Sequence, residues 1–248
     1  RFASVRFPGK ALAEVAGQPL IRHVWERTRQ LRSVGRVVVA TDDDRIRAAA
    51  EAFGAEVVMT SSDCVNGTER CAEAAAALGG FDIVVNLQGD APLTPHWFVE
   101  DLIAAMKADK TAQMATPVLQ CDAQTYAMFK EDRAAGRVGG TTAVFGAEGR
   151  AIYFSKEVLP YIDAGKVPSE NIPVYHHVGV YAYRPEALKA YISWPECQLE
   201  KLEGLEQLRF LYNGVAVKCV EVEARGRLFW ELNNPEDVAR IEKVLAEQ

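Results

Sequence analysis

Three basic side chains and one serine stand within the first ten residues, a stretch that contains no acidic residue: Arg1, Ser4, Arg6 and Lys10. Arginine and lysine supply fixed cationic donors for phosphate oxygens, and the serine hydroxyl adds a further polar group. Gly9 would allow the backbone to approach a ligand closely. From spacing alone, a phosphate-binding loop and a solvated basic arm explain this stretch equally well.

A second group of polar residues, Asn86-Leu-Gln88-Gly89-Asp90, follows the apolar run at 82–87. In open α/β sheets, ligands bind beyond the carboxyl ends of the strands. A carboxylate in that place can hold Mg²⁺, which takes one or two carboxylates together with substrate phosphates. We therefore predict that Asp90 binds a metal ion, with a helix-capping aspartate in a β-turn as the alternative.

A third group, Asn66-Gly67-Thr68-Glu69-Arg70, stands where a helix is expected to begin. The backbone N–H groups of a helix N-terminus favour anions. The alternative is simple capping of the helix by Asn66 or Thr68, and the motif alone favours it.

Two further pairs lie in the second half of the chain. His176 and His177 are adjacent on a predicted strand and would point to opposite faces, so at most one of them reaches a given site. Glu206 and Gln207 are adjacent on a predicted helix, where both could edge a pocket or simply form part of a solvated face.

The elements that would position these residues alternate between strand and helix in the first half of the chain. Short, continuous apolar runs are typical of buried strands, and they occur at 36–40, 55–59, 82–87 and 113–119. Helical patterns lie between them, at 19–31 with Pro19 in the first position, 45–53, 68–78 and 97–107. This alternation predicts an α/β fold with a doubly wound, mostly parallel sheet.

The second half has a mixed α+β pattern. We predict a hairpin of strands 141–145 and 151–154 around the turn 146–149, followed by an exposed loop at 163–173. Further strands are expected at 174–183 and 215–221, with helices at 199–212 and from Asn234-Pro235 to Ala246. The chain starts directly in the basic stretch, although a doubly wound sheet normally has a strand before its phosphate-binding loop. We therefore expect a first strand to precede Arg1.

Composition excludes several classes of protein. The net charge of −6 lacks the basic surplus of a nucleic-acid-binding protein, and no apolar run is long enough to span a membrane. The five cysteines are odd in number and form no C-x-x-C pair, which favours reduced thiols in the cytoplasm. The four histidines show no zinc-binding spacing.

Seven motifs, taken in order, closely resemble one family, the 3-deoxy-manno-octulosonate cytidylyltransferases or CMP-Kdo synthetases. The resemblance extends from Arg1 to about Val244, nearly the whole chain, and seven motifs in register are highly specific. They are Arg1-x-x-Ser4-x-Arg6-x-Pro8-Gly9-Lys10, Ala40-Thr41-Asp42, Gly67-Thr68-Glu69-Arg70, Asn86-Leu-Gln88-Gly89-Asp90, Tyr153-Phe154-Ser155, His177-x-Gly179-x-Tyr181 and Leu205-Glu206-Gln207-Leu208-Arg209.

The resemblance implies transfer of CMP from CTP to the anomeric hydroxyl of an acidic 3-deoxy sugar, with release of pyrophosphate, for lipopolysaccharide or capsule synthesis. It implies Mg²⁺ as cofactor, a bacterial cytoplasmic location and a homodimer. The expected architecture is a single nucleotidyltransferase domain of Rossmann-like type over 1–248. Within it, residues from about 120 to 215 would form a subregion for sugar binding and dimerisation.

The resemblance also assigns roles to individual residues. Arg6, Lys10 and Asp90 would carry the catalysis, with Arg6 and Lys10 on the phosphates and Asp90 on the metal. Arg1, Ser4, Thr41 and Gln88 would bind the nucleotide. The sugar site would be lined by Arg70, which could pair with the sugar carboxylate, and by His177, Tyr181, Glu206 and Gln207.

The chain departs from the family pattern at three places. Asn233 stands where the family has a metal-binding aspartate, Ala91 replaces the usual glutamate, and Thr141-Thr142-Ala143-Val144 lacks a lysine. Asn233 could still offer a neutral oxygen to the metal. These changes leave open which 3-deoxy-ulosonate is the substrate, Kdo or a related one. The alternatives are a catalytically weak homologue that binds nucleotide sugars and a CMP-nonulosonate synthetase.

Overall fold

The structure is a computed structural model that describes residues 7–137, 140–227, 229–232 and 237–246. The chain forms two compact units, one of residues 1–103 and 224–248 and the other of residues 104–223. The boundary at 103/104 falls inside helix α4 (His96–Ala108). The subregion expected at about 120–215 lies within the second unit and stays a prediction.

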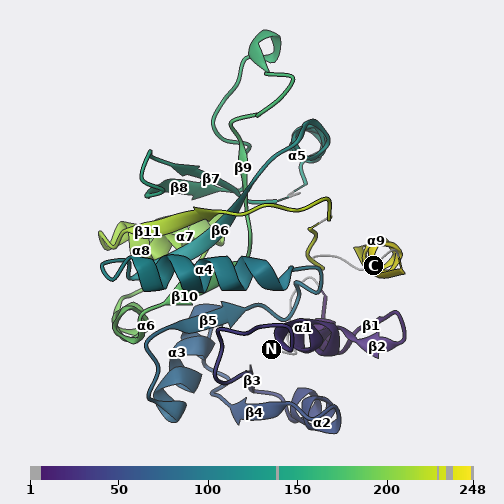
Figure 1. Ribbon diagram of the computed structural model, residues 1–248, viewed down its shortest axis with the longest axis vertical. Helices are drawn as coiled ribbons and strands as arrows, with labels where there is room; N and C mark the ends of the chain where they lie inside the picture. The colour runs from purple at the N-terminus through teal and green to yellow at the C-terminus, as the bar shows by residue number, and fades with distance from the viewer. Residues whose placement is uncertain (1–6, 138–139, 228, 233–236, 247–248) are drawn as a thin grey trace. The chain divides into compact units, whose positions relative to one another are not determined.

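The first unit combines two small sheets with helices (Figure 1). Strands β1 and β2 form an antiparallel hairpin, whereas β3 and β4 pair in parallel, with Val38 opposite Glu56 and Thr41 opposite Met59. Helix α2 connects these parallel strands and packs against both. Besides α4, the elements of the unit are η1 (Lys10–Leu12), β1 (Glu14–Val15), β2 (Gln18–Pro19), α1 (Leu20–Thr28), β3 (Val38–Thr41), α2 (Asp44–Ala52), β4 (Glu56–Met59), α3 (Gly67–Leu78), β5 (Val84–Leu87) and α9 (Asp237–Ala246).

Side-chain caps fix where the helices of the first unit begin. The carboxylate of Asp43 accepts hydrogen bonds from the first backbone N–H groups of α2, and Asn66 does the same for α3 through Glu69 N. Asn66 therefore has the capping role that the sequence offered as an alternative. Pro19 precedes α1 as its N-cap, so its predicted place at the first helical position is wrong by one residue.

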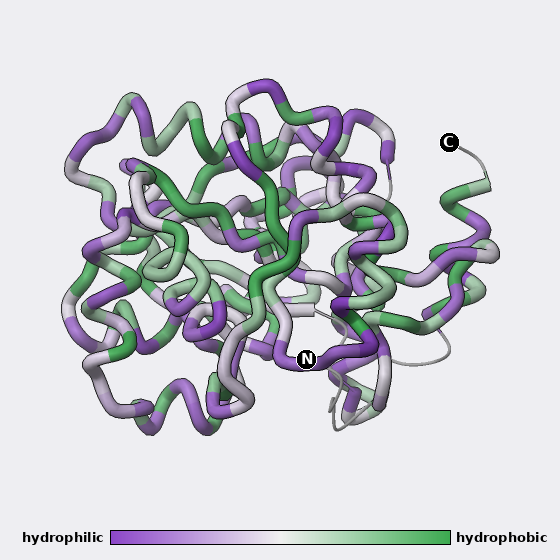
Figure 2. The backbone as a smooth tube through the Cα atoms, turned by 90° about the horizontal axis from the view of Figure 1, so that it is seen from below, coloured by the Kyte–Doolittle hydropathy of each residue, from purple (hydrophilic) through white to green (hydrophobic). Residues whose placement is uncertain are grey.

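Apolar side chains hold the first unit together in two clusters. The first joins the β1–β2 hairpin and α1 to α9, and it consists of Val15, Leu20, Leu93, Leu232 and Ile241. The second packs α2 onto the parallel strands through Val39, Ile46, Ala50 and Ala55. Along the chain, hydrophobic stretches alternate with hydrophilic ones, the pattern of elements with one buried face (Figure 2).

The second unit is built around strand β6, which pairs in parallel with β11 and antiparallel with β9 and β10. Strand β7 pairs antiparallel with both β8 and β9. The sheet of this unit is thus mixed, whereas the sequence predicted a mostly parallel one. Its elements are β6 (Met114–Gln120), α5 (Ala123–Ala134), β7 (Thr142–Phe145), β8 (Ala151–Ser155), η2 (Ala164–Lys166), β9 (Tyr175–His177), β10 (Val180–Tyr183), α6 (Pro185–Ser193), α7 (Gln198–Glu203), α8 (Leu208–Tyr212) and β11 (Val217–Glu221).

Two predicted elements of the second unit are each split in two. The strand expected at 174–183 breaks between β9 and β10. The helix expected at 199–212 ends at Gly204, which adopts a left-handed conformation (φ 62°), and α8 begins only at Leu208. Glu206 and Gln207 therefore lie in a connection between helices, and the prediction that both lie on one helix is wrong.

The hairpin around 146–149 is confirmed, since Gly146 N bonds to Arg150 O at 2.9 Å. The loop at 163–173 is largely exposed, but Ile172 anchors its end in a buried cluster with Cys121, Phe129 and Val174. Helices α5 and α6 are additions to the predicted elements.

Candidate active site

Lys10 and Asp90 form an ion pair in the first unit, between Lys10 Nζ and Asp90 Oδ2, although 80 residues separate them in the chain. Lys10 is presented by a tight turn in which Gly9 has a φ of 73°, a conformation that favours glycine. Asp90 follows β5, and its carbonyl accepts from Leu232 N at 2.8 Å. The predicted phosphate-binding lysine and the predicted metal-binding carboxylate thus belong to one site.

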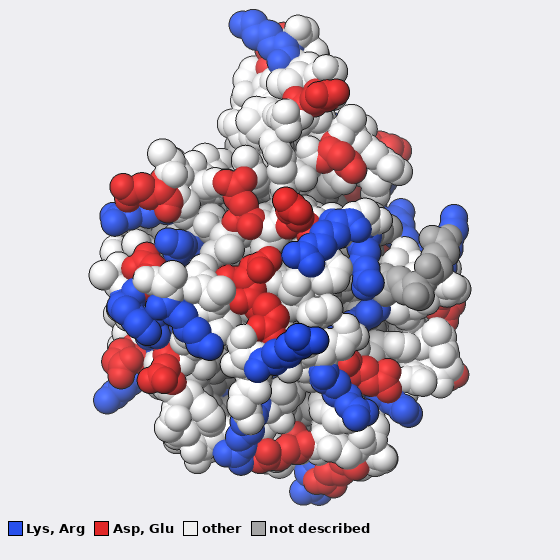
Figure 3. Space-filling view, viewed as in Figure 1, with Lys and Arg blue, Asp and Glu red and all other residues white. Residues whose placement is uncertain are grey.

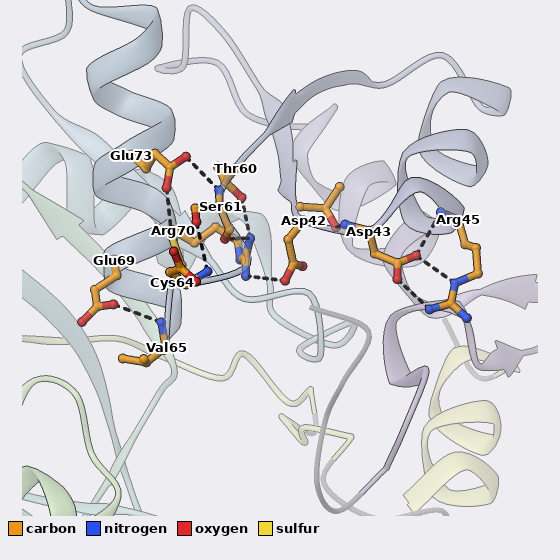
Figure 4. A network of polar contacts seen from close by, with 12 residues as sticks. Asp42, Asp43, Arg45, Thr60, Ser61, Cys64, Val65, Glu69, Arg70 and Glu73 are labelled. Atoms are coloured by element: carbon orange, nitrogen blue, oxygen red, sulfur yellow. Dashed lines mark hydrogen bonds and ion pairs between the residues drawn. The ribbon is translucent and has the colours of Figure 1, made fainter.

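A second polar cluster surrounds Arg70 on α3 (Figure 4). Its Nη1 donates to Thr60 Oγ1, and its Nη2 lies 3.2 Å from Asp42 Oδ2. The side chains of Arg70 and Asp42 are only 9% and 15% exposed. Asp42 comes from the end of β3 and Thr60 from the end of β4, so the two parallel strands jointly hold the guanidinium.

The Arg70 cluster is not fully satisfied. Within the described part of the chain, neither Asp42 Oδ1 nor Arg70 Nη2 has a hydrogen-bond partner, although both atoms are buried. Buried polar groups are normally paired, and unpaired ones mark places where a ligand or water completes the set. The pair therefore offers one acceptor and one charge-assisted donor to an incoming group.

Carboxylates around this cluster fix the loop that leads into α3 (Figure 4). Glu73 accepts from Ser61 N at 2.8 Å and from Cys64 Sγ at 3.1 Å, while Glu69 accepts from Val65 N at 3.0 Å. These contacts hold the segment between β4 and α3, and with it Thr60, in one conformation.

A third cluster, in the second unit, is uncharged and almost fully buried. His177, Tyr181 and Gln207 are 5%, 3% and 0% exposed. The His177 and Tyr181 rings lie 5.5 Å apart, and Tyr181 OH lies 3.3 Å from Gln207 Oε1. Gln207 Nε2 is buried with no hydrogen-bond partner in the described chain.

The two adjacent histidines contact different groups, in line with the prediction that they point to opposite faces. His176 packs edge-on against Phe129 at 4.9 Å, whereas His177 packs against Phe154 at 5.1 Å. Burial lowers the pKa of His176 to about 4, and burial together with the neighbouring His176 lowers the pKa of His177 to about 3. Both rings are therefore neutral at neutral pH.

A buried ion pair fixes the connection that carries Glu206 and Gln207. Arg209 Nε and Nη2 lie 2.6 and 2.7 Å from the two carboxylate oxygens of Glu200, which also accepts from Tyr191 OH at 3.0 Å. Arg209 N in turn bonds to Glu206 O at 3.2 Å. This bidentate pair ties α7 to α8 on both sides of the connection.

The other predicted site residues are placed as follows. Thr41 is 1% exposed, and its hydroxyl accepts from Asp43 N at 3.2 Å. Gln88 is half-buried, and its carbonyl accepts from Ala91 N. Arg1, Ser4, Arg6 and Asn233 lie outside the described residues.

Sequence reasoning missed three residues that contact the predicted ones. Asp42 and Thr60 hold Arg70, and Thr116 lies 2.9 Å from His177 through its hydroxyl. Asp42 belongs to the Ala40-Thr41-Asp42 motif, so its signal was present. Thr60 and Thr116 lie at or within apolar runs, where only pairing of the strands reveals their neighbours.

Two positions that depart from the family pattern have structural roles here. Ala91 is 1% exposed in the turn after Asp90. The Thr142 hydroxyl donates to Glu157 O at 2.7 Å and accepts from Leu159 N at 3.2 Å. The threonine therefore ties β7 to the segment that follows β8.

A metal ion would find one described carboxylate, Asp90, at the end of β5. No group of three or more histidine, cysteine, aspartate or glutamate side chains gathers among the described residues. The carboxylate of Asp90 is of the kind that binds Mg²⁺ together with substrate phosphates.

The described surface and helices agree with two further features of the sequence, its mixed charge and its lack of long apolar runs. On the face drawn in Figure 3, acidic and basic side chains are mixed and no broad basic area stands out. Among the described helices, none has the length and hydrophobicity needed to cross a membrane.

Comparison with known proteins defines the class of this chain. The cytidylyltransferase family model matches residues 1–222, and the chain belongs to this family of nucleotidyltransferases. Its α/β fold agrees with that assignment.

Individual relatives are more specific. The 3-deoxy-manno-octulosonate cytidylyltransferase of Maricaulis maris is 44% identical over 99% of this chain and 94% of its own. The mitochondrial enzyme of the same name from Arabidopsis thaliana is 37% identical over 100% of this chain and 81% of its own. A solved structure of CMP:2-keto-3-deoxy-manno-octonic acid synthetase complexed with CTP is similar at a TM-score of 0.84 and 32% identity, covering 99% of this chain and 95% of that chain.

Proposed function

We propose that this protein transfers CMP from CTP to the anomeric hydroxyl of 3-deoxy-manno-octulosonate (Kdo) or a related 3-deoxy-ulosonate, releasing pyrophosphate. The observation that carries the proposal is the meeting of Lys10 and Asp90 in one site of a cytidylyltransferase chain. The reaction is a displacement at the α-phosphorus, for which positioning and charge matter more than covalent catalysis.

On the nucleotide side, Lys10 would bind the triphosphate oxygens, and Arg1, Ser4 and Arg6 would bind the nucleotide with it. Asp90 would hold Mg²⁺, assisted by phosphate oxygens and by a neutral oxygen of Asn233. The bound metal would supply positive charge where negative charge develops on the phosphates. Since Lys10 and Asp90 neutralise each other in the ligand-free chain, binding of CTP exchanges the partners of both groups. Thr41 and Gln88 would lie near the nucleotide.

On the sugar side, Arg70 would bind the carboxylate of the substrate. Its guanidinium is already held by Thr60 and Asp42, which lowers the entropy lost on binding, and its Nη2 retains a free donor. His177, Tyr181, Glu206 and Gln207 would contact the hydroxyl groups through neutral and charged hydrogen bonds.

We further propose a homodimer formed through the second unit and a location in the bacterial cytoplasm. The family resemblance is the basis for the dimer, and exposed apolar side chains on this unit are the ones to test: Ile152, Leu202 and Tyr212 are 64%, 74% and 63% exposed. The five cysteines are free thiols, which supports a reducing compartment. Light scattering of the wild type and of Leu202→Glu tests the dimer, because a charge at the interface would shift the mass towards the monomer.

The activity is tested with CTP, Mg²⁺ and a panel of 3-deoxy-ulosonates and nonulosonates, with pyrophosphate release and the CMP-sugar both measured. We expect pyrophosphate release only with an acidic sugar, and highest kcat/KM with Kdo or a close relative. Arg6→Ala and Lys10→Ala should each raise the KM for CTP, whereas Lys107→Ala, at an exposed position on α4, should not.

Two outcomes would overturn the Kdo assignment. A higher kcat/KM with a nonulosonate would make the protein a CMP-nonulosonate synthetase. Binding of CTP without turnover of any sugar would make it a weak homologue that binds nucleotides.

A further inference from the structure

The Thr116 hydroxyl on β6 lies among three polar atoms in the second unit. Its Oγ1 is 2.8 Å from Val180 O, 3.2 Å from Val178 O and 2.9 Å from His177 Nε2. Thr116 is 0% exposed, so water does not compete for these contacts. The three partners flank the break between β9 and β10, where the predicted single strand divides.

Counting protons decides how this group is arranged. A threonine hydroxyl has one proton, and a carbonyl oxygen can only accept. If the hydroxyl donated to His177 Nε2, its oxygen would face the lone pairs of both carbonyls with no proton between them. It therefore donates its proton in hydrogen bonds to the carbonyls, chiefly to Val180 O, and its oxygen accepts a hydrogen bond from His177 Nε2–H.

The other ring nitrogen then has a lone pair. In a neutral imidazole one nitrogen donates and the other accepts, so a proton on Nε2 leaves Nδ1 as the acceptor. The contact of the ring with Thr116 is made through Nε2, which leaves Nδ1 for another partner. The ring is 5% exposed and is held between Phe154 and Tyr181, which restricts its rotation.

We propose that Thr116 is a positioning residue that holds His177 with its proton on Nε2, so that Nδ1 presents a permanent acceptor to a hydroxyl group of the acidic sugar. This inference rests on the proposed function, which places His177 at the sugar. In this role, His177 recognises the direction in which a sugar hydroxyl donates its hydrogen bond, and it takes no part in proton transfer.

A donor of the same cluster complements this acceptor. Gln207 Nε2 is buried without a partner in the described chain, while its Oε1 lies 3.3 Å from Tyr181 OH. A hydroxyl group both donates and accepts, so sugar hydroxyls can satisfy Nδ1 of His177 and Nε2 of Gln207 together. A carbonyl or ether oxygen can only accept and would leave Nδ1 unsatisfied.

Nitrogen NMR of the ¹⁵N-histidine-labelled protein without ligands tests the tautomer directly. The chain has four histidines, and His177→Gln identifies the signals of interest by their loss. We expect a protonated Nε2 and an unprotonated Nδ1 between about pH 5 and pH 8, because burial lowers the pKa of His177 to about 3. Thr116→Val should shift signals towards the Nδ1–H form, whereas Thr116→Ser, which keeps the hydroxyl, should not.

Kinetics test the positioning role. Thr116→Val should raise the KM for the sugar about 10-fold and leave the KM for CTP unchanged, and Thr116→Ser should restore the sugar KM. A merely structural threonine would change both KM values or only the melting temperature. Serine therefore serves as the matched control for loss of packing.

Two results would overturn the proposal: an Nδ1–H tautomer in the wild type, or a Thr116→Val variant with both tautomer and sugar KM unchanged. Failure of the proposed function gives a different result. The wild type would then show the expected Nε2–H tautomer and no CMP transfer to any acidic sugar, which overturns the sugar role of Nδ1 alone.

Discussion

The two units of the chain place different kinds of polar group at the residues assigned to the reaction. In the first unit the groups are charged and joined in pairs across distant segments, as in Lys10–Asp90 and Arg70–Asp42. In the second unit, three of the four assigned groups are neutral, nearly inaccessible and connected by hydrogen bonds and ring contacts: His177, Tyr181 and Gln207. The fourth, Glu206, is charged and half-buried.

This difference separates two ways of recognising a ligand. Cationic side chains attract phosphates and carboxylates over a distance, and dissolved salt weakens this attraction. Neutral buried groups recognise the direction of a hydroxyl and lose affinity when one partner is left unpaired. Substitutions in the first unit should therefore change charge-dependent steps, and those in the second should change discrimination among sugars.

The largest effect is expected for Asp90→Asn, which removes the described carboxylate of the proposed metal site and leaves Lys10 unpaired. We expect kcat to fall about 100-fold or more, because fixed charge near the reacting phosphates stabilises the transition state. Asp63→Asn, at an exposed position in the same unit, is the matched control. Steady-state rates at saturating Mg²⁺ provide the measurement, and a change below about 3-fold would remove Asp90 from the metal site.

The next effect is expected for Arg70→Ala. Loss of a charge-assisted pair with the sugar carboxylate should raise the sugar KM about 10- to 100-fold. Titration calorimetry should show CTP binding unchanged. Asp42→Asn should raise the sugar KM less, because it loosens the guanidinium without removing it. Equal loss of both ligands in Arg70→Ala would show that the residue serves the fold instead.

The neutral cluster is tested by the pH dependence of stability. His176 and His177 have folded pKa values of about 4 and about 3, below the ordinary value of 6.5, so the unfolded chain binds their protons more readily. Stability is therefore complete above about pH 6.5 and falls as the pH drops towards 4, by roughly 1.4 kcal/mol per pH unit for each histidine.

Urea denaturation at several pH values measures the slope of the free energy of unfolding against pH. His176→Gln and His177→Gln should each reduce it, since the substituted side chain no longer titrates. The lowered pKa values of Asp43, about 2, and of Glu56, Glu100 and Glu157 add to the loss of stability below about pH 5. The contribution of the histidines is therefore measured between about pH 5 and pH 6.5. An unchanged slope in both variants would show that the buried histidines are not the cause.

The smallest effect is expected for Asn233→Asp, which restores the carboxylate that the family resemblance places there. A second negative charge should lower the Mg²⁺ concentration for half-maximal rate about 2- to 5-fold and leave kcat nearly unchanged. Titration of the rate with Mg²⁺ measures it. An unaltered Mg²⁺ dependence would place Asn233 away from the metal.

Elements with strong local signals were predictable from the sequence. The apolar runs became β3, β4, β5 and β6 within a few residues, and the glycine-flanked hairpin of β7 and β8 formed as expected. The two errors of continuity have different causes, one local and one distant in the chain. Gly204 takes a left-handed conformation that ends α7, and the Thr116 hydroxyl contacts the carbonyls on both sides of Gly179. Thr116 lies 62 and 64 residues before these two carbonyls in the chain, so no local pattern shows the second cause.

The candidate site was predictable in its residue types but not in its pairings. The motifs pointed to Lys10, Arg70 and Asp90 because phosphate and carboxylate chemistry needs those side chains. That Arg70 would lie against Asp42 follows only from the parallel pairing of β3 with β4. Helix α6 does carry a signal in the sequence, Pro185 in its first turn.

Three buried thiols, Cys64, Cys121 and Cys219, give each unit its own reporter of opening kinetics. Burial raises the pKa of Cys64 to about 11, with the hydrogen bond to Glu73 as a further cause, and raises the pKa values of Cys121 and Cys219 to about 12. Alkylating reagents attack the thiolate, so these cysteines become reactive only when the surrounding structure opens. The alkylation rate of Cys64 would measure how fast the first unit opens. The alkylation rates of Cys121 and Cys219 would measure how fast the second unit opens.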